Sequence, residues 1–238
     1  MVLPRAILLD LDDTILDAGG GIAPAWKEAC AAHCSELGSI DPGTLYDAIE
    51  QTRQWFWSDD ARHRRGRLDL DAAAREVVTL AIASLGISNP DVGARIAARY
   101  SEVRRKGFEP FPGAVETLRW CRDSGSRLAL VSNGNAATQW GKINRFELRE
   151  LFDAILIEGA LGFGKPDPRV YQRALEELDT PAGNAWMIGD HLEFDVAQPQ
   201  RMGMFGIWID ANGTGLPADS SVKPDRILRR LADLRANA

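Results

Sequence analysis

Short apolar runs alternate with helical patterns over the second half of the chain. An apolar run of four or five residues is typical of a strand buried on both faces of a parallel sheet. The expected strands span residues 6–9, 127–131, 154–158, 185–188 and 205–209. The intervening segments with helical spacing span residues 113–124, 138–144, 167–178 and 195–202. Because strands that alternate with helices form right-handed βαβ units, this pattern predicts an α/β protein with a Rossmann-like, doubly wound parallel sheet.

Residues 18–108 carry helical periodicity without a convincing strand. A first helix is expected at residues 24–34, and Asp41-Pro42 supplies the N-cap and the first-turn proline of a second. Gly86 can end a third helix, and a fourth is expected from about Asp91. The residues that recur at helical spacing are Leu45, Ile49 and Phe56 in the second helix, Leu80, Ser84 and Leu85 in the third, and Val92, Ile96 and Val103 in the fourth.

The pattern changes again at Phe108–Gly113, where two prolines indicate a boundary. The sequence therefore predicts an α/β core made of residues 1–17 and 109–238, interrupted by an all-helical domain of residues 18–108. Hinges are expected where the chain passes between the two domains, at residues 18–21 and 108–113. The first of these segments includes three consecutive glycines.

Two carboxylates follow directly after the first expected strand. Strand side chains alternate in direction, so Asp10 and Asp12 should leave the strand on the same side. Ligands bind at the carboxyl ends of strands in open α/β sheets. Two carboxylates held this close repel each other unless a cation or a shared proton offsets the charge. The segment therefore indicates a divalent metal site, although Asp12-Asp13-Thr14 is also compatible with an ordinary polar turn.

Polar residues follow two further strands and a proline-rich loop. Ser132 and Asn133 precede a helix, where hydroxyl, amide and backbone N–H groups suit a phosphoryl group. Lys165 is followed by two prolines within three residues and can neutralise phosphate charge or that of a carboxylate. Asp190 closes a later strand, and Asp195 follows five residues later in the sequence. Asp195 is also compatible with a role as the cap of the helix that is expected to begin there.

In chain order these residues resemble the four motifs of the haloacid dehalogenase-like hydrolase superfamily, most of whose members are magnesium-dependent phosphatases. The matching segments are Asp10-Leu11-Asp12-Asp13-Thr14, Ser132-Asn133, Lys165 before Pro166, and Gly189-Asp190 with Asp195. The resemblance implies that the helical insertion is a type 1 cap. It also implies that Asp10 is a nucleophile that forms an aspartyl phosphate, while Asp12 acts as general acid and base.

The remaining site residues follow from the same resemblance. Thr14, Ser132, Asn133 and Lys165 are expected to bind phosphate, and Thr14 to orient the two carboxylates. Mg²⁺ is the expected cofactor because it prefers oxygen ligands. Its expected ligands are Asp10, Asp190 and the backbone carbonyl of Asp12, while Asp195 is expected to hold a water or a ligand from outside the coordination sphere.

The expected reaction is hydrolysis of a small phosphorylated metabolite. Asp12 counts against dehalogenases and phosphonate hydrolases, because those members of the superfamily lack this carboxylate. Phosphomutases usually carry glycine where this chain has Asp13. Phosphoryl transfer by a phosphotransferase or phosphomutase is the enzymatic alternative. A non-catalytic, phospho-accepting binding module is the alternative from a different class.

Composition narrows the partners and the compartment. A net charge of −6 argues against nucleic acid, and no apolar run approaches the roughly 20 residues that span a bilayer. Three cysteines are too few for a disulfide framework, so we expect a cytoplasmic protein. The basic segment Arg62–Arg67 is expected to be a solvated turn between helices. The sequence leaves the exact substrate open, as well as the choice between monomer and homodimer.

Overall fold

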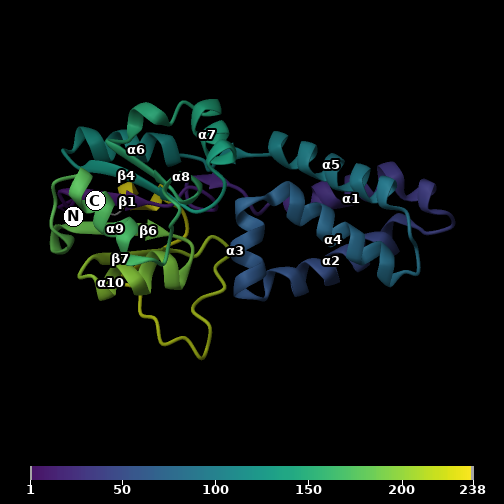
Figure 1. The fold of residues 1–238 in the computed structure, drawn as a ribbon. Coiled ribbons are helices and arrows are strands. Elements are labelled where there is room, and N and C mark those ends of the chain that lie inside the picture. The colour runs from purple at the N-terminus through teal and green to yellow at the C-terminus, as the bar shows by residue number, and fades with distance from the viewer. Residues whose placement is uncertain (1, 237–238) are drawn as a thin grey trace. The chain divides into compact units, whose positions relative to one another are not determined.

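A computed structural model describes residues 2–236 of the chain (Figure 1). The chain divides into two compact units. The first combines the residues up to Asp17 with those from Glu109 onward, and the second comprises Ala18–Phe108. No helix of the described residues is long and apolar enough to cross a membrane.

The first unit contains a six-stranded sheet in which every neighbouring pair of strands is parallel. Its order is β5-β4-β1-β6-β7-β8. The strands are β1 (Ala6–Leu9), β4 (Arg127–Ser132), β5 (Ala154–Ile157), β6 (Ala185–Gly189), β7 (Phe205–Ile209) and β8 (Arg226–Leu228). Chain order reverses at β1, and ligands of doubly wound sheets bind at such a reversal. The predicted α/β fold class is confirmed.

Helices cover both faces of this sheet, as the apolar strands require. Ile7 and Leu9 of β1 pack into a core that includes Leu118, whereas Ala6 and Leu8 pack into a second core around Tyr171. The helices are α6 (Ala114–Asp123), α7 (Ala136–Arg145), α8 (Glu158–Leu161), α9 (Pro168–Glu177), α10 (Gln198–Arg201) and α11 (Asp233–Ala236). Figure 1 shows α6 and α7 on one side and α9 and α10 on the other.

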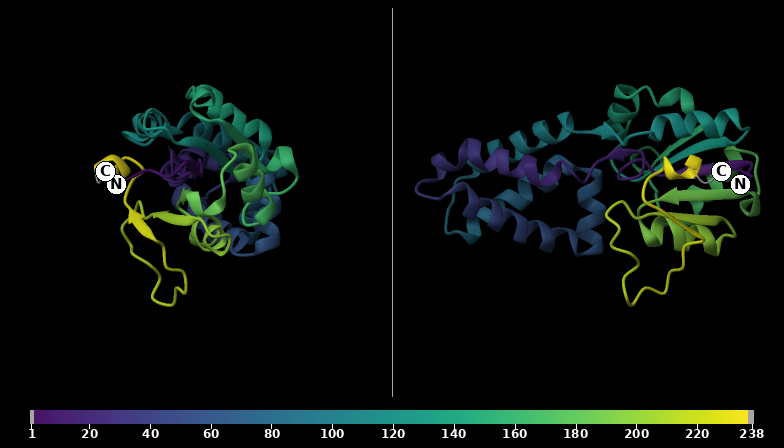
Figure 2. Two further views of the ribbon diagram at one scale, coloured as in Figure 1. Left: turned by 90° about the vertical axis from the view of Figure 1, so that its left-hand side faces the viewer. Right: turned by 180° about the vertical axis from the view of Figure 1, so that it is seen from behind.

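Three features of this unit differ from the sequence-based expectation. Strand β8 was not predicted, because its three residues lie at the sheet edge after a long loop (Figure 2). The antiparallel pair of β2 (Leu16–Asp17) and β3 (Glu109–Pro110) is likewise too short to leave a pattern. The helix expected to start near Asp195 begins earlier, as the π-helical segment η4 (Leu192–Ala197) capped by His191.

The second unit is all-helical and has one hydrophobic core of its own. Its helices are α1 (Ile22–His33), α2 (Pro42–Trp57), α3 (Asp60–Leu68), α4 (Leu70–Ser84) and α5 (Pro90–Lys106), with a 3₁₀ turn, η1 (Cys34–Leu37), after α1. The Asp41 side chain accepts hydrogen bonds from the backbone N–H groups of Gly43 and Thr44, which confirms it as the N-cap of α2.

Two expectations for the second unit were wrong. The basic segment Arg62–Arg67 lies in α3 and is not a turn, because Asp59 caps that helix through the backbone N–H of Arg62. Gly66 lets α3 approach α2, since a Cβ there would lie 2.7 Å from the Phe56 ring. In α4, the face with Leu80 and Ser84 is exposed. The helix instead buries Ala73, Ala74, Val77, Val78, Ala81 and Ile82.

Candidate active site

Three neighbouring strands carry predicted site residues to one edge of the sheet. Asp10 directly follows β1, Ser132 ends β4, and Asp190 directly follows β6. Because these strands are parallel, their carboxyl ends meet at the same edge. The backbone N–H of Asp10 donates to the carbonyl of Ile188 at 3.0 Å. The hydrogen bonds between β1 and β6 therefore continue as far as Asp10. The Trp208 indole N–H donates to the carbonyl of Asp190 at 2.8 Å.

Lys165 lies at the centre of this group. Its Nζ atom is 2.6 Å from Asp10 Oδ1 and 2.7 Å from Asp195 Oδ1, and the residue is only 2% exposed. Burial by itself lowers the pKa of Lys165, but the two carboxylates outweigh that effect and raise the pKa above its ordinary value. The lysine is therefore a fixed, fully charged ammonium group.

Asn133 holds the backbone of Lys165. Its Nδ2 donates to the Lys165 carbonyl at 2.7 Å, and its Oδ1 accepts from the Lys165 backbone N–H at 2.8 Å. Gly164 permits this approach, because a Cβ there would lie 2.4 Å from Asn133 Oδ1. The amide side chain therefore holds the lysine loop, and the phosphate contact expected of Asn133 stays a prediction.

Three carboxylates surround the lysine, and their charges are not balanced. Ligand atoms of Asp10, Asp190 and Asp195 all lie within 4.8 Å of one another. Burial is the main cause that raises the pKa of Asp10 to about 7, against the lowering effect of Lys165. Burial and the neighbouring carboxylates raise the pKa of Asp190 to about 8. When the three carboxylates are ionised, the single positive charge of Lys165 leaves two negative charges uncompensated. One divalent cation would neutralise them.

The donor set fits a hard cation such as Mg²⁺, because the group offers carboxylate oxygens and no nitrogen or sulfur. Asp195 is already engaged: its Oδ1 accepts from Lys165, and its Oδ2 accepts from the backbone N–H of His191 at 3.0 Å. The Thr14 hydroxyl is buried without a hydrogen-bond partner among the described residues, so it does not orient the carboxylates as expected. An orphaned buried hydroxyl indicates a missing polar group nearby.

Asp12 lies in different surroundings from Asp10. Both of its carboxylate oxygens face Lys142 Nζ, at 2.7 and 2.8 Å, and Oδ2 also accepts from Gln139 Nε2 at 3.0 Å. Both partners come from α7. Sequence reasoning missed them, because polar residues on an amphipathic helix are typical of a solvated face.

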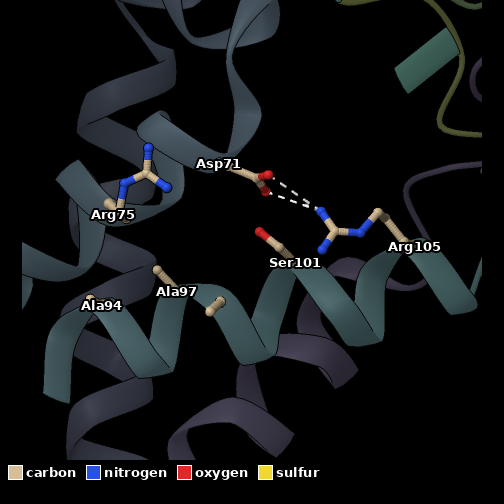
Figure 3. A pocket seen from close by; sticks show the side chains of 7 residues that line it. Asp71, Arg75, Ala94, Ala97, Ser101 and Arg105 are labelled. Carbon is tan, nitrogen blue, oxygen red and sulfur yellow. Dashed lines mark hydrogen bonds and ion pairs between the residues drawn. The ribbon is translucent and has the colours of Figure 1, made fainter. Parts of the chain in front are cut away.

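The second unit contains a separate surface pocket between α4 and α5 (Figure 3). Its volume is about 120 Å³. The Asp71 carboxylate, which lines it, pairs with Arg105 at 3.3 Å, as the dashed lines of Figure 3 mark. The lining residues are Asp71, Arg75, Ala94, Ala97, Ala98, Ser101 and Arg105. The pocket therefore includes none of the site residues predicted from the sequence.

Comparison with known proteins identifies the family of this chain. The family model of the haloacid dehalogenase-like hydrolases matches residues 4–203. Glyceraldehyde 3-phosphate phosphatase from Pyrococcus abyssi is 27% identical over 207 residues, which are 86% of this chain and 80% of that protein.

Solved structures share the whole fold. The HAD-hydrolase YfnB from Bacillus subtilis, solved bound to magnesium, gives a TM-score of 0.75 at 21% identity, covering 99% of this chain and 98% of that one. The 2-haloacid dehalogenase from Pseudomonas syringae pv. Tomato gives 0.63 at 26% identity, covering 98% and 97%. With the family model matched over most of its length, the chain belongs to the haloacid dehalogenase-like hydrolases and is an enzyme.

Proposed function

We propose that this hydrolase is a magnesium-dependent phosphomonoesterase that acts on a small phosphorylated metabolite. The observation that carries the proposal is the convergence of Asp10, Asp190, Asp195 and Lys165 at one edge of the sheet, with two negative charges in excess. The similarity to glyceraldehyde 3-phosphate phosphatase supports a phosphate ester as substrate. Because identity to that protein is only 27%, the proposal extends to the class of substrate and not to that compound.

Asp10 is the proposed nucleophile. Its carboxylate attacks the phosphorus atom, the bond to the leaving oxygen breaks, and an aspartyl phosphate forms. Water then attacks this intermediate and releases phosphate. The 2.6 Å hydrogen bond from Lys165 supports the role, because it occupies Oδ1 and orients the carboxylate. The lysine charge also offsets that of the bound phosphoryl group.

Asp12 is the proposed general acid and base. It gives a proton to the leaving oxygen in the first step and takes one from the attacking water in the second. Its position two residues after Asp10, with a side chain held by α7, supports this division of roles. Ser132, Thr14 and Lys165 are the proposed phosphate contacts, and the orphaned Thr14 hydroxyl supports such a contact. Asn133 is a further proposed phosphate contact, and its side chain also holds the Lys165 backbone.

Asp10, Asp190 and the backbone carbonyl of Asp12 are the proposed Mg²⁺ ligands. When bound, the ion supplies positive charge that lowers the repulsion between the nucleophile and an anionic phosphate. Asp195 acts from outside the coordination sphere, because its two oxygens already bind Lys165 and the His191 backbone. The helical unit Ala18–Phe108 is the proposed cap, with hinges at residues 18–21 and 108–113.

The test is phosphate release from p-nitrophenyl phosphate with magnesium and with a chelator. We expect turnover only with magnesium, and Asp10→Asn should lower it by roughly six orders of magnitude, as expected when a nucleophile is removed. Asp179→Asn is the matched control, because Asp179 is an exposed carboxylate paired with Arg5 on the surface, and its turnover should equal that of the wild type. Activity that survives both chelation and Asp10→Asn would contradict the proposal.

A further inference from the structure

We propose that Gln139 and Lys142 are positioning residues that aim the Asp12 carboxylate for proton transfer. The inference rests on the proposed phosphatase function, in which Asp12 is the acid and base. It goes beyond that function because the four motifs include neither residue. Both belong to α7, three residues apart, and therefore lie on the same face of that helix.

Lys142 is a buried lysine with its charge directed at Asp12. Its side chain is 6% exposed, whereas that of Asp12 is 33% exposed. An ammonium group so far from solvent is stable only when paired, and here Nζ lies at 2.7 and 2.8 Å from the two oxygens of one carboxylate. Contact with both oxygens fixes the direction of the Asp12 side chain as well as its distance.

Gln139 connects Asp12 to the neighbouring strand end. The residue is 2% exposed, and its Nε2 atom lies 3.0 Å from Asp12 Oδ2 and 2.6 Å from Ser132 Oγ. The same nitrogen lies 3.1 Å from the Asn133 carbonyl. An amide has two hydrogens for these three acceptors, so the contacts form one shared arrangement. The proposed acid and the proposed phosphate hydroxyl are therefore oriented by a single side chain.

The backbone of Asp12 is fixed independently of α7. The next residue, Asp13, has a positive φ of 58°, and its N–H donates to the Leu16 carbonyl at 2.7 Å. The N–H groups of Ile15 and Leu16 both donate to the carbonyl of Leu11 at 2.9 Å. This turn fixes the backbone of Asp12, and the two α7 residues fix the position of its carboxylate. Without the two α7 contacts, the carboxylate has several rotamers available.

The nucleophile does not depend on α7, because Asp10 is held by Lys165. Loss of Lys142 should therefore weaken proton transfer and leave nucleophilic attack intact. Proton transfer matters most when the departing oxygen is strongly basic. Phenolate is a more basic leaving group than p-nitrophenolate, and the two aryl phosphates have similar shapes. The ratio of their kcat/KM values therefore reports on Asp12 in particular.

The experiment compares phenyl phosphate with p-nitrophenyl phosphate in the full-length protein with magnesium. We expect Lys142→Met to lower kcat/KM by about tenfold for phenyl phosphate and by about twofold or less for p-nitrophenyl phosphate. Both losses are smaller than the contribution of a general acid, because Asp12 itself is still present. KM should stay unchanged, and Lys142→Arg should recover most of the loss. Arg145→Met is the control, since Arg145 ends the same helix but pairs with Glu109 at 3.1 Å, and its ratio should equal that of the wild type.

A double-mutant cycle separates positioning from general damage. If Lys142 acts through Asp12, then Lys142→Met should add no further loss to Asp12→Asn. If Lys142→Met unfolds, which its thermal unfolding midpoint would show, Lys142→Gln gives the same test, because it also removes the charge that faces Asp12. Equal losses on both substrates, or additive losses in the cycle, would overturn this inference alone. A wild-type protein without magnesium-dependent turnover of either aryl phosphate would overturn the proposed function itself.

Discussion

Asp10 and Asp12 are two residues apart, yet their carboxylates lie in opposite electrostatic situations. Asp10 shares one lysine with Asp195 and faces Asp190, so negative charge is in excess. Both oxygens of Asp12 face the Lys142 ammonium group, so a positive charge offsets that of the carboxylate. The first group needs a further positive charge before it can hold all its carboxylates ionised. The second needs none.

The difference shows how one strand end can serve two purposes. A buried group with excess charge is stable only with protons or a cation, and this suits a metal site. A carboxylate that already faces a buried ammonium group has no such requirement, and its contacts restrict its direction instead. Changes to the group around Asp10 should therefore alter charge-dependent stability, whereas changes to the contacts of Asp12 should alter proton transfer.

The largest effect on stability is expected from Lys165→Met. The change leaves buried Asp10 and Asp195 without their cation, and removal of one partner from a buried ion pair costs about 3–5 kcal/mol. Urea unfolding at pH 8 in a chelator measures this loss. Arg173→Met is the control, because the exposed pair of Arg173 and Glu177 should contribute less than about 1 kcal/mol. Similar losses in both variants would show that Lys165 is not the electrostatic centre of the group.

Asp12→Asn should affect turnover and leave metal binding intact. Loss of a general acid lowers kcat/KM by about 100-fold or more. The increase in thermal midpoint on addition of magnesium should equal that of the wild type, because the proposed ligand from Asp12 is its backbone carbonyl. If Asp12→Asn also abolished that increase, the side chain would belong to the charged group, and the contrast with Asp10 would disappear.

The metal-free protein should lose stability as pH rises. The pKa of Asp10 is raised from 3.8 to about 7, and that of Asp190 to about 8. The folded protein therefore keeps protons that the unfolded chain releases, and stability falls as pH rises through the folded pKa values. Between pH 6 and pH 8, where both carboxyls ionise in the folded state, we expect a loss of about 2–4 kcal/mol.

Chemical unfolding in a chelator at several pH values measures this loss. Magnesium should remove most of it, so its stabilising effect should be larger at pH 8 than at pH 6. Asp10→Asn should flatten the dependence, whereas Asp12→Asn should change it much less, because Asp12 makes the smallest contribution to the raised pKa of Asp10. A metal-free protein that gains stability between pH 6 and pH 8 would contradict the assignment of excess charge to this group.

Much of the fold follows from local patterns in the sequence. The buried strands are short apolar runs, and their sequence positions alone place Asp10, Ser132 and Asp190 at one edge once the sheet is parallel. The face of α4 was misread because Leu80 has an apolar side chain but is 40% exposed, while small residues such as Ala73 and Ala81 form the buried face. Hydrophobicity does not reveal which face of a helix a neighbouring helix covers.

The part of the candidate site that the sequence did not predict depends on tertiary contacts. Lys142 and Gln139 lie about 130 residues from Asp12 along the chain and have no motif to mark them. Asn133 is expected at the phosphate, and only the approach of the Lys165 loop shows that its amide atoms also hold that loop. Residue type predicts which groups a site contains, whereas the partner of each group depends on loops and helices that meet in space.

The smallest effect is expected from the N-cap of α7, and it tests whether that helix acts as a positioning element. The Asn135 side chain accepts a hydrogen bond from the Thr138 N–H at 3.1 Å, and Asn135→Ala should cost about 1 kcal/mol of stability. The first turn of α7 should fray, which would loosen Gln139 and lower kcat/KM for phenyl phosphate by about twofold relative to p-nitrophenyl phosphate.

Asn89→Ala is the matched control for this last variant. Asn89 caps α5 in the helical unit through the Val92 N–H at 3.2 Å, so its loss of stability should be similar. Because Asn89 caps a helix other than α7, its ratio between the two aryl phosphates should equal that of the wild type. If both variants changed this ratio equally, lower stability alone would explain the effect of Asn135→Ala. A change confined to Asn135→Ala would mean that the orientation of Asp12 depends on the first turn of α7.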